Sequence, residues 1–116
     1  MPELHTLSLT QQISGLRESK FSCKELIDTY IKRIEDINPS LNCFISLENK
    51  DVLYNQASES DKRYANNSPL PLDGIPIAHK DIFCTEGMLT TCGSKILSNF
   101  IPPYSSTVVT KLKDSG

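Results

Sequence analysis

The segment from Ser22 to Pro39 constrains the fold of this 116-residue chain more than any other, because it carries the clearest helix signals in the sequence. Ser22 and Glu25 have the Ser-x-x-Glu spacing of a capping box, and Phe21 can pack on Leu26 as a hydrophobic staple. Apolar residues then recur at helical period, until Asn38-Pro39 is expected to stop the helix. These positions are Leu26, Ile27, Tyr30, Ile31, Ile34 and Ile37.

Two short segments have the patterns of β-strands. Residues 41–47 (LNCFISL) alternate apolar and polar side chains, which predicts a half-buried strand. Residues 75–80 (IPIAHK) form a short apolar run between turn residues, which predicts a strand covered on both sides, with Pro76 near its start or on an edge. Strands that alternate with helices predict an α/β domain.

Other segments have weaker helix signals. Residues 9–16 carry apolar side chains on one face, and Gly15 is expected to end that helix. Residues 48–65 predict a surface helix on which Glu59 and Arg63 are spaced for an i,i+4 ion pair. A brief helix is expected around 95–100, and a last helix is expected to begin after a cap at Ser105 or Ser106.

The composition is that of one globular domain. Apolar residues make up 38% of the chain, charged residues 22%, and the net charge is -2. The 12 Lys and Arg residues form no basic run against 14 acids, which argues against binding nucleic acid by phosphate neutralisation. Residues 1–10 lack the features of a signal peptide, and no segment is long enough to span a bilayer. We therefore expect a cytoplasmic protein.

The four cysteines do not predict a metal site. They lie at positions 23, 43, 84 and 92, and without a secretory signal we expect reduced thiols. Zinc usually takes closely spaced pairs, whereas Cys84 and Cys92 have seven residues between them and His79 is the one imidazole nearby. Buried or inert thiols are the simpler interpretation.

Lys80 is the candidate catalytic residue, because a lysine at the end of an apolar strand can lose its hydration and act as a neutral base. The pattern alone favours a solvated Lys80–Asp81 pair instead. Candidate nucleophiles are weak. Ser94 lacks the Gly-x-Ser-x-Gly elbow and is best placed to cap a helix, and Cys84 or Cys92 would need a histidine beside it in space. The chain has no glycine-rich loop for a phosphate.

Three stretches resemble the amino-terminal region of amidase signature enzymes. They are GIPIAHKDIFCTEGMLTTCGS at 74–94, NFIPPYSSTVVTKLKDSG at 99–116 and FSCKELIDTYIKRIEDINPSLNCFI at 21–45. Within that family the chain is most similar to the A subunit of bacterial aspartyl/glutamyl-tRNA amidotransferases. The resemblance implies the amino-terminal portion of the amidase signature fold, a mixed central sheet between helical layers, incomplete in this chain.

The resemblance also implies a reaction. Such enzymes use a Ser-cis-Ser-Lys triad to hydrolyse glutamine, and Lys80 matches the lysine that serves as general acid and base. The ammonia released passes to partner subunits B and C, where the complex uses ATP and magnesium to transamidate misacylated tRNA. The chain itself is expected to bind no cofactor and no metal, and its substrate-binding residues are not identified.

The two triad serines have no match in residues 1–116. They would lie in a Gly-Ser-rich signature beyond Gly116, as would the glutamine-binding residues. We therefore expect residues 1–116 to be the amino-terminal part of an amidase domain, inactive alone and marginally stable without neighbouring strands. Two alternatives stay open. One is a fragment of a generic small-molecule amidase, and the other is a non-catalytic scaffold or partner-binding piece.

Overall fold

The structure is a computed structural model that describes residues 3–116, so the first two residues of the stretch compared with signal peptides lie outside it. Within the described range the chain forms four α-helices and one 3-10 helix, with no β-strand. Their bounds are Leu4–Thr6 (η1), Leu9–Arg17 (α1), Cys23–Leu41 (α2), Lys50–Ala65 (α3) and Thr107–Asp114 (α4).

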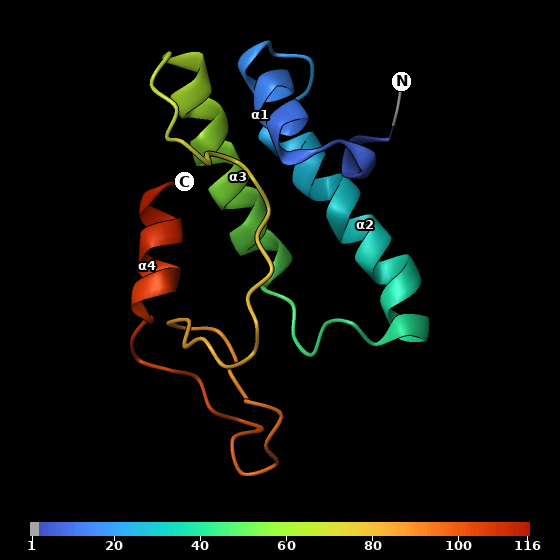
Figure 1. The fold of residues 1–116 in the computed structure, drawn as a ribbon, viewed down its shortest axis with the longest axis vertical. Coiled ribbons are helices and arrows are strands. Elements are labelled where there is room, and N and C mark those ends of the chain that lie inside the picture. Colours follow the sequence, from blue (N-terminus) through green and yellow to red (C-terminus); the bar gives the residue numbers. More distant parts are fainter. Residues whose placement is uncertain (1–2) are drawn as a thin grey trace.

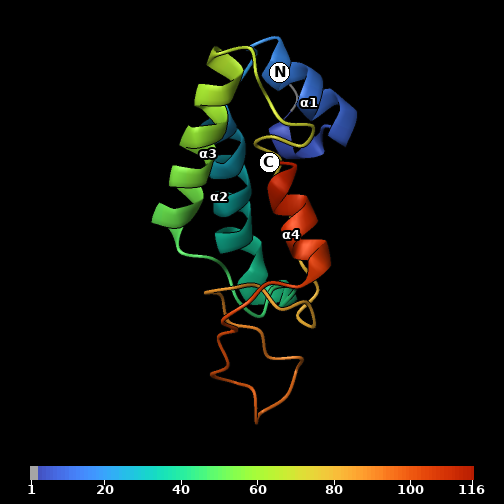
Figure 2. The ribbon, with the colours of Figure 1, turned by 90° about the vertical axis from the view of Figure 1, so that its left-hand side faces the viewer.

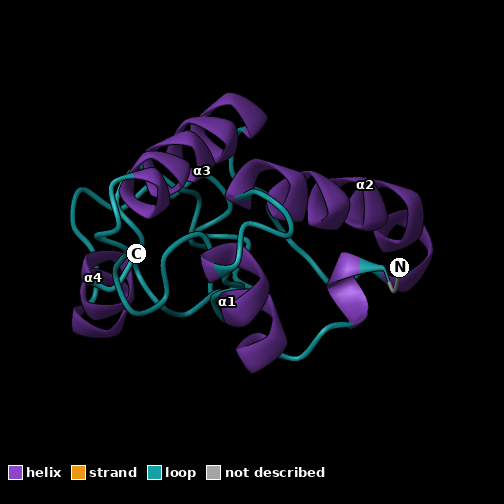
Figure 3. Cartoon of the chain, turned by 90° about the horizontal axis from the view of Figure 1, so that it is seen from above, coloured by secondary structure: helices purple, strands orange, loops and turns teal. Residues whose placement is uncertain are grey.

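The helices α2 and α3 lie side by side with opposite directions and form the main packing unit (Figure 1). The core is centred on four buried residues. They are Leu16 of α1, Cys23 and Leu26 of α2, and Ala57 of α3. Seen from above, α1 lies on one side of the α2–α3 pair, and α4 lies at the far end from the amino terminus (Figure 3). The amphipathic helix predicted from residues 23–37 is therefore confirmed as a core element.

The predicted start of α2 is confirmed, and its predicted end is wrong. The Ser22 hydroxyl accepts from the Glu25 amide at 3.0 Å, and the Ser22 amide donates to the Glu25 carboxylate at 2.8 Å. The helix continues through Pro39 to Leu41 and ends at Asn42, whose φ is 53°. The Asn42 amide still reaches the Asn38 carbonyl at 2.7 Å, so the last turn closes despite the proline.

The prediction of a mixed central sheet is wrong for the described residues. Residues 41–47 begin within α2 and then run on without a ladder, because the Asn38 side chain takes the backbone groups of Phe44. The Phe44 amide donates to Asn38 at 2.9 Å, and the Phe44 carbonyl accepts from Asn38 at 3.2 Å. Residues 75–80 are also irregular, and Ile77 and Lys80 are exposed where a doubly covered strand was predicted. No backbone hydrogen bond in the described range joins the two segments.

The smaller helix predictions have mixed outcomes. The helices expected at 9–16 and 48–65 are confirmed as α1 and α3, although Gly15 lies inside α1 and does not end it. The cap at Ser106 is confirmed, since its hydroxyl accepts from the Val109 amide at the start of α4. Residues 95–100 form turns closed by bonds three residues apart, such as Phe100 amide to Leu97 carbonyl at 3.0 Å, and no helix.

A long irregular segment, residues 66–106, connects α3 to α4. It passes along the helices and then forms an extended loop below them before α4 returns towards α1 (Figure 2). One hydrogen bond, from the Leu72 amide to the Ser115 carbonyl at 2.8 Å, ties its beginning to the end of α4. This segment carries Lys80 and the Thr-Thr-Cys-Gly stretch, so the contacts that anchor the segment determine where these residues lie.

Gly74 is the tightest of those anchors. Its φ is +76°, and a Cβ at this position would lie 2.2 Å from the Cys23 sulfur in the core. Cys23 is completely buried. Burial is the main reason that the pKa of its thiol is raised, and a contact with Asp61 raises it further. The backbone at Gly74 therefore approaches the α2 core as closely as a residue without a side chain permits.

We expect Gly74→Ala to destabilise the chain more than Gly87→Ala. Gly87 has a similar φ of +75°, but no atom lies within 4 Å of the place that a Cβ would take, so its variant reports backbone strain alone. That strain costs about 1–2 kcal/mol, and the contact with Cys23 should add about 1–3 kcal/mol of overpacking. Urea unfolding of both variants measures the difference. Equal losses of stability would show that the Cys23 contact relaxes freely.

Candidate functional site

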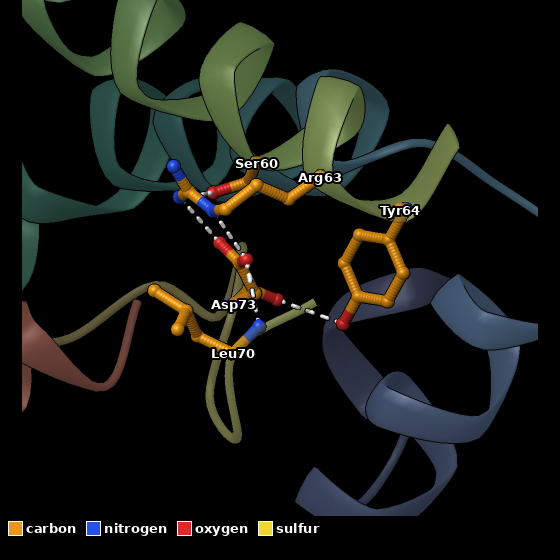
Figure 4. Close-up of polar contacts among 5 residues, drawn as sticks. All are labelled: Ser60, Arg63, Tyr64, Leu70 and Asp73. Atoms are coloured by element: carbon orange, nitrogen blue, oxygen red, sulfur yellow. Dashed lines mark hydrogen bonds and ion pairs between the residues drawn. The ribbon is translucent and has the colours of Figure 1, made fainter. Parts of the chain in front are cut away.

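A buried carboxylate fixes the start of the segment that leads to Lys80. Asp73 is fully buried, and both of its oxygens accept from Arg63 of α3 at 2.6 Å. It also accepts from the Leu70 amide at 3.0 Å, and its own carbonyl accepts from the Tyr64 hydroxyl at 3.0 Å (Figure 4). Arg63 is held in turn by a 3.1 Å bond to the Ser60 hydroxyl.

The electrostatics of this anchor favour a charged Asp73. Burial by itself raises the pKa of the carboxyl, but interactions with Arg63, Ser60 and the Leu70 amide outweigh it, so the pKa is lowered overall. Glu59 was predicted to pair with Arg63 and does not. It pairs with Lys62 at 2.6 Å, which leaves Arg63 to Asp73. The paired charges make this a structural element rather than a reactive one.

Lys80 follows seven residues after Asp73 in a stretch with no regular structure. Its side chain is exposed, and none of the ion pairs in residues 3–116 includes it. The Lys80 carbonyl accepts from the Phe83 amide at 3.0 Å and so opens a tight turn. The amine therefore stands free of protein partners in the described part of the chain, whereas its backbone is held.

Asp81 is not the solvated partner of Lys80 that the sequence pattern favoured. Its carboxylate accepts from the Thr91 amide at 2.9 Å and from the Thr91 hydroxyl in a shorter bond. The Thr91 hydroxyl is the main reason that the pKa of Asp81 is lowered, followed by the Thr91 amide. The Asp81 carbonyl also accepts from the Cys92 amide at 2.8 Å. Three contacts thus join the Lys-Asp dipeptide to the Thr-Thr-Cys-Gly stretch.

The turn at Thr91 is well anchored on its other side. Thr90 and Thr91 are 3% and 7% exposed, and the Thr90 amide donates to the Phe100 carbonyl at 3.0 Å. The Thr91 hydroxyl also accepts from the Gly93 amide at 3.2 Å. Cys92 has a φ of 53°, in the left-handed region. Lys80 therefore lies next to a hydrogen-bonded turn whose two threonines are buried.

The structure does not bring the other candidates to Lys80. The Ser94 hydroxyl accepts from the Ile96 amide at 3.2 Å in a turn and caps no helix. The Cys84 thiol contacts the Tyr104 hydroxyl at 3.6 Å, and Cys92 is exposed. All four cysteines are free. Among residues 3–116, no three His, Cys, Asp or Glu side chains group in a way that could hold a metal ion.

Two polar contacts of this region were not predicted from the sequence. Arg63 with Asp73 and Asp81 with Thr91 each join residues ten positions apart across irregular chain. For the contact between Asp81 and Thr91, the one usable signal in the sequence was that a Lys-Asp motif is followed by a Thr-Thr-Cys-Gly motif. Across residues 3–116 the structure has no helix with the length and apolarity needed to cross a membrane.

Comparison with protein families matches residues 25–116 to the amidase family. The chain is also similar to proteins named as the A subunit of glutamyl-tRNA(Gln) amidotransferase. It is 48% identical to that of Hahella chejuensis over 112 residues, 97% of this chain and 22% of the relative. It is 48% identical to that of Psychrobacter cryohalolentis and 44% to that of Acinetobacter baumannii, in each case over 116 residues, 100% of this chain and 23% of the relative.

A solved structure has the same arrangement. It belongs to work on an unexpected vestigial protein complex that reveals the evolutionary origins of an s-triazine catabolic enzyme, and it superposes with a TM-score of 0.87 at 26% identity. The match covers 95% of this chain and 24% of that one. The chain thus spans less than a quarter of the length of the relatives described above. Because the family match covers most of its residues, the chain belongs to the amidase family.

Proposed function

We propose that this chain is the amino-terminal part of the glutamine-hydrolysing A subunit of a tRNA-dependent amidotransferase. The carrying observation is its 44–48% identity to subunits of that name over 97–100% of its length. The ammonia would be used by partner subunits B and C, with ATP and magnesium, to transamidate misacylated tRNA in the cytoplasm. None of these substrates or cofactors is assigned to residues of this chain.

Within that function we propose Lys80 as the general acid and base. A neutral amine there would accept the proton of the nucleophilic serine hydroxyl, relayed through the second serine of the triad, as that oxygen attacks the carboxamide carbon of glutamine. The carbon–nitrogen bond then breaks, the proton returns to the leaving ammonia, and water releases glutamate from the acyl-enzyme. The contacts of Asp81 support this role, because its carboxylate is bound to Thr91 and leaves the Lys80 amine without an ion-pair partner in the described residues.

Residues 1–116 alone are proposed to be inactive. The Lys80 side chain is exposed, and no hydrogen bond joins its amine to a hydroxyl nucleophile in the described residues. Polypeptide packed over Lys80 would have to exclude water and supply the serine. One base without a nucleophile cannot carry the covalent step.

An ammonia-release assay on the complete polypeptide with its partner subunits tests the function. Glutamine should be hydrolysed in preference to simple carboxamides, and transfer to misacylated tRNA should require ATP and magnesium. The 116-residue chain measured in parallel should release no ammonia. Equal hydrolysis of simple carboxamides without partners would favour a generic amidase. Absence of any hydrolysis from the assembled complex would favour a scaffold.

A further inference from the structure

Asp81 and Lys80 are adjacent in the chain but differ in how they are held. The Asp81 carboxylate makes two hydrogen bonds to Thr91, which is 7% exposed, while the Lys80 side chain is exposed and unpaired in the described residues. A carboxylate beside a lysine ordinarily competes for its ammonium group. Here the hydrogen bonds to Thr91 occupy that carboxylate.

The contacts of Asp81 fix more than its side chain. Its carbonyl accepts from the Cys92 amide at 2.8 Å, so both its backbone and its carboxylate are bound to the same turn. The Lys80 carbonyl accepts from the Phe83 amide at 3.0 Å, which holds the peptide group between residues 80 and 81. The Cα of Lys80 therefore has a defined position, from which its amine can be aimed.

We propose that Asp81 and Thr91 are positioning residues for Lys80. Their hydrogen bonds hold Asp81, and with it the adjoining Lys80 backbone, against the turn at Thr91, and they keep the adjacent carboxylate from pairing with the lysine amine. The inference rests on the proposed function, since it assigns the pair a task only if Lys80 is the base. Neither residue touches substrate in this role. Both act by setting where the amine lies.

Valine in place of Thr91 tests the proposal in the complete enzyme with its partner subunits. Valine keeps the shape of threonine but removes the hydroxyl that binds Asp81. We expect kcat for ammonia release from glutamine to fall by about ten- to a hundredfold, because small displacements of a catalytic group have effects of this size. KM should stay unchanged, since the base contributes to the chemical step rather than to glutamine binding.

Two further variants separate positioning from a general loss of packing. Thr91→Ser retains the hydroxyl and should recover most of the lost rate. Thr90→Val removes a neighbouring hydroxyl that is also buried but binds only the Met88 carbonyl, at 3.3 Å, and it should leave kcat unchanged. A serine variant as slow as the valine variant, or a Thr90→Val variant that loses the same rate, would overturn the proposal.

A double variant gives the sharpest readout. If Thr91 acts only through Lys80, Thr91→Val should not reduce further the residual activity of Lys80→Ala. An additional loss equal to that of Thr91→Val alone would show that Thr91 acts elsewhere, and the inference would fail. If Lys80→Ala itself kept the parent rate, the proposed function would fail. If only Lys80→Ala lost activity, the function would stand and the positioning role would not.

Discussion

Replacing Lys80 by alanine in the complete enzyme should lower kcat for ammonia release from glutamine by about a thousandfold or more. A general acid–base group contributes about 10²–10⁴-fold, and residues of one catalytic unit lose most of the unit's effect when one is removed. The rate of glutamine-dependent ammonia release measures this directly. KM should change little, because in its proposed role the amine transfers protons and does not bind the carboxamide.

Two lysine variants control for charge. Lys80→Arg keeps the positive charge but cannot give up its proton near neutral pH, so it should be as inactive as the alanine variant. Lys95→Ala removes another exposed lysine of the same irregular segment and should keep the parent rate. Activity retained by Lys80→Arg would show that a fixed cation, rather than a base, is what the reaction needs at this position.

The helices could be predicted from the sequence because their signals are local. Ser22 with Glu25 and Ser106 with Val109 satisfy backbone groups three residues away, so the bond and its signal lie in one short window. The end of α2 was predicted wrongly because the local signal at Pro39 was taken alone. Pro39 indicates a stop, but the contacts of Asn38 with Phe44 and with the Asn42 amide carry the helix on for another turn.

The strand predictions were wrong because a β-strand forms only where a second backbone segment pairs with it. Residues 41–47 and 75–80 have suitable side chains, but a ladder needs a second backbone at the right distance, and within residues 3–116 neither segment supplies one to the other. The Asn38 side chain accepts a hydrogen bond from the Phe44 amide and donates one to the Phe44 carbonyl. Alternation of side chains is therefore insufficient evidence for a sheet when the partner strand is not identified.

In the candidate site, too, local sequence signals could be interpreted, whereas contacts between distant residues could not be predicted. Lys80 was found through a motif, whereas the partners of Asp81 and Arg63 lie ten residues away in each case. The structure gives a physical reason why Arg63 pairs with Asp73 and not with Glu59. Glu59 is on the surface of α3, but Asp73 is fully buried and offers two oxygens to the guanidinium. A guanidinium that binds both oxygens of a buried carboxylate makes a stronger pair than two charges on the exposed surface.

That choice leads to the largest expected effect on stability. Arg63→Ala leaves the buried Asp73 carboxylate without its cation, and breaking buried pairs costs about 3–5 kcal/mol. We expect the lower end, about 3 kcal/mol, because the Arg63 side chain is 35% exposed and its charge is partly screened. Urea unfolding near neutral pH measures the loss. Lys62→Ala, which removes the neighbouring surface pair with Glu59, should change stability little.

The dependence of this effect on pH identifies its cause. In the parent chain the pKa of Asp73 is lowered, so its stabilisation is present above the ordinary value of about 3.9 and is lost as pH falls through the folded-state pKa. In Arg63→Ala, burial is opposed only by weaker contacts, so the pKa of Asp73 should rise and protonation should favour the folded state. The variant should therefore gain stability as pH falls from about 7 to about 5, where the parent is unchanged. If the difference in stability between the parent and Arg63→Ala is constant across that range, Arg63 stabilises the chain by packing. The Arg63 guanidinium would then not act by compensating the charge of Asp73.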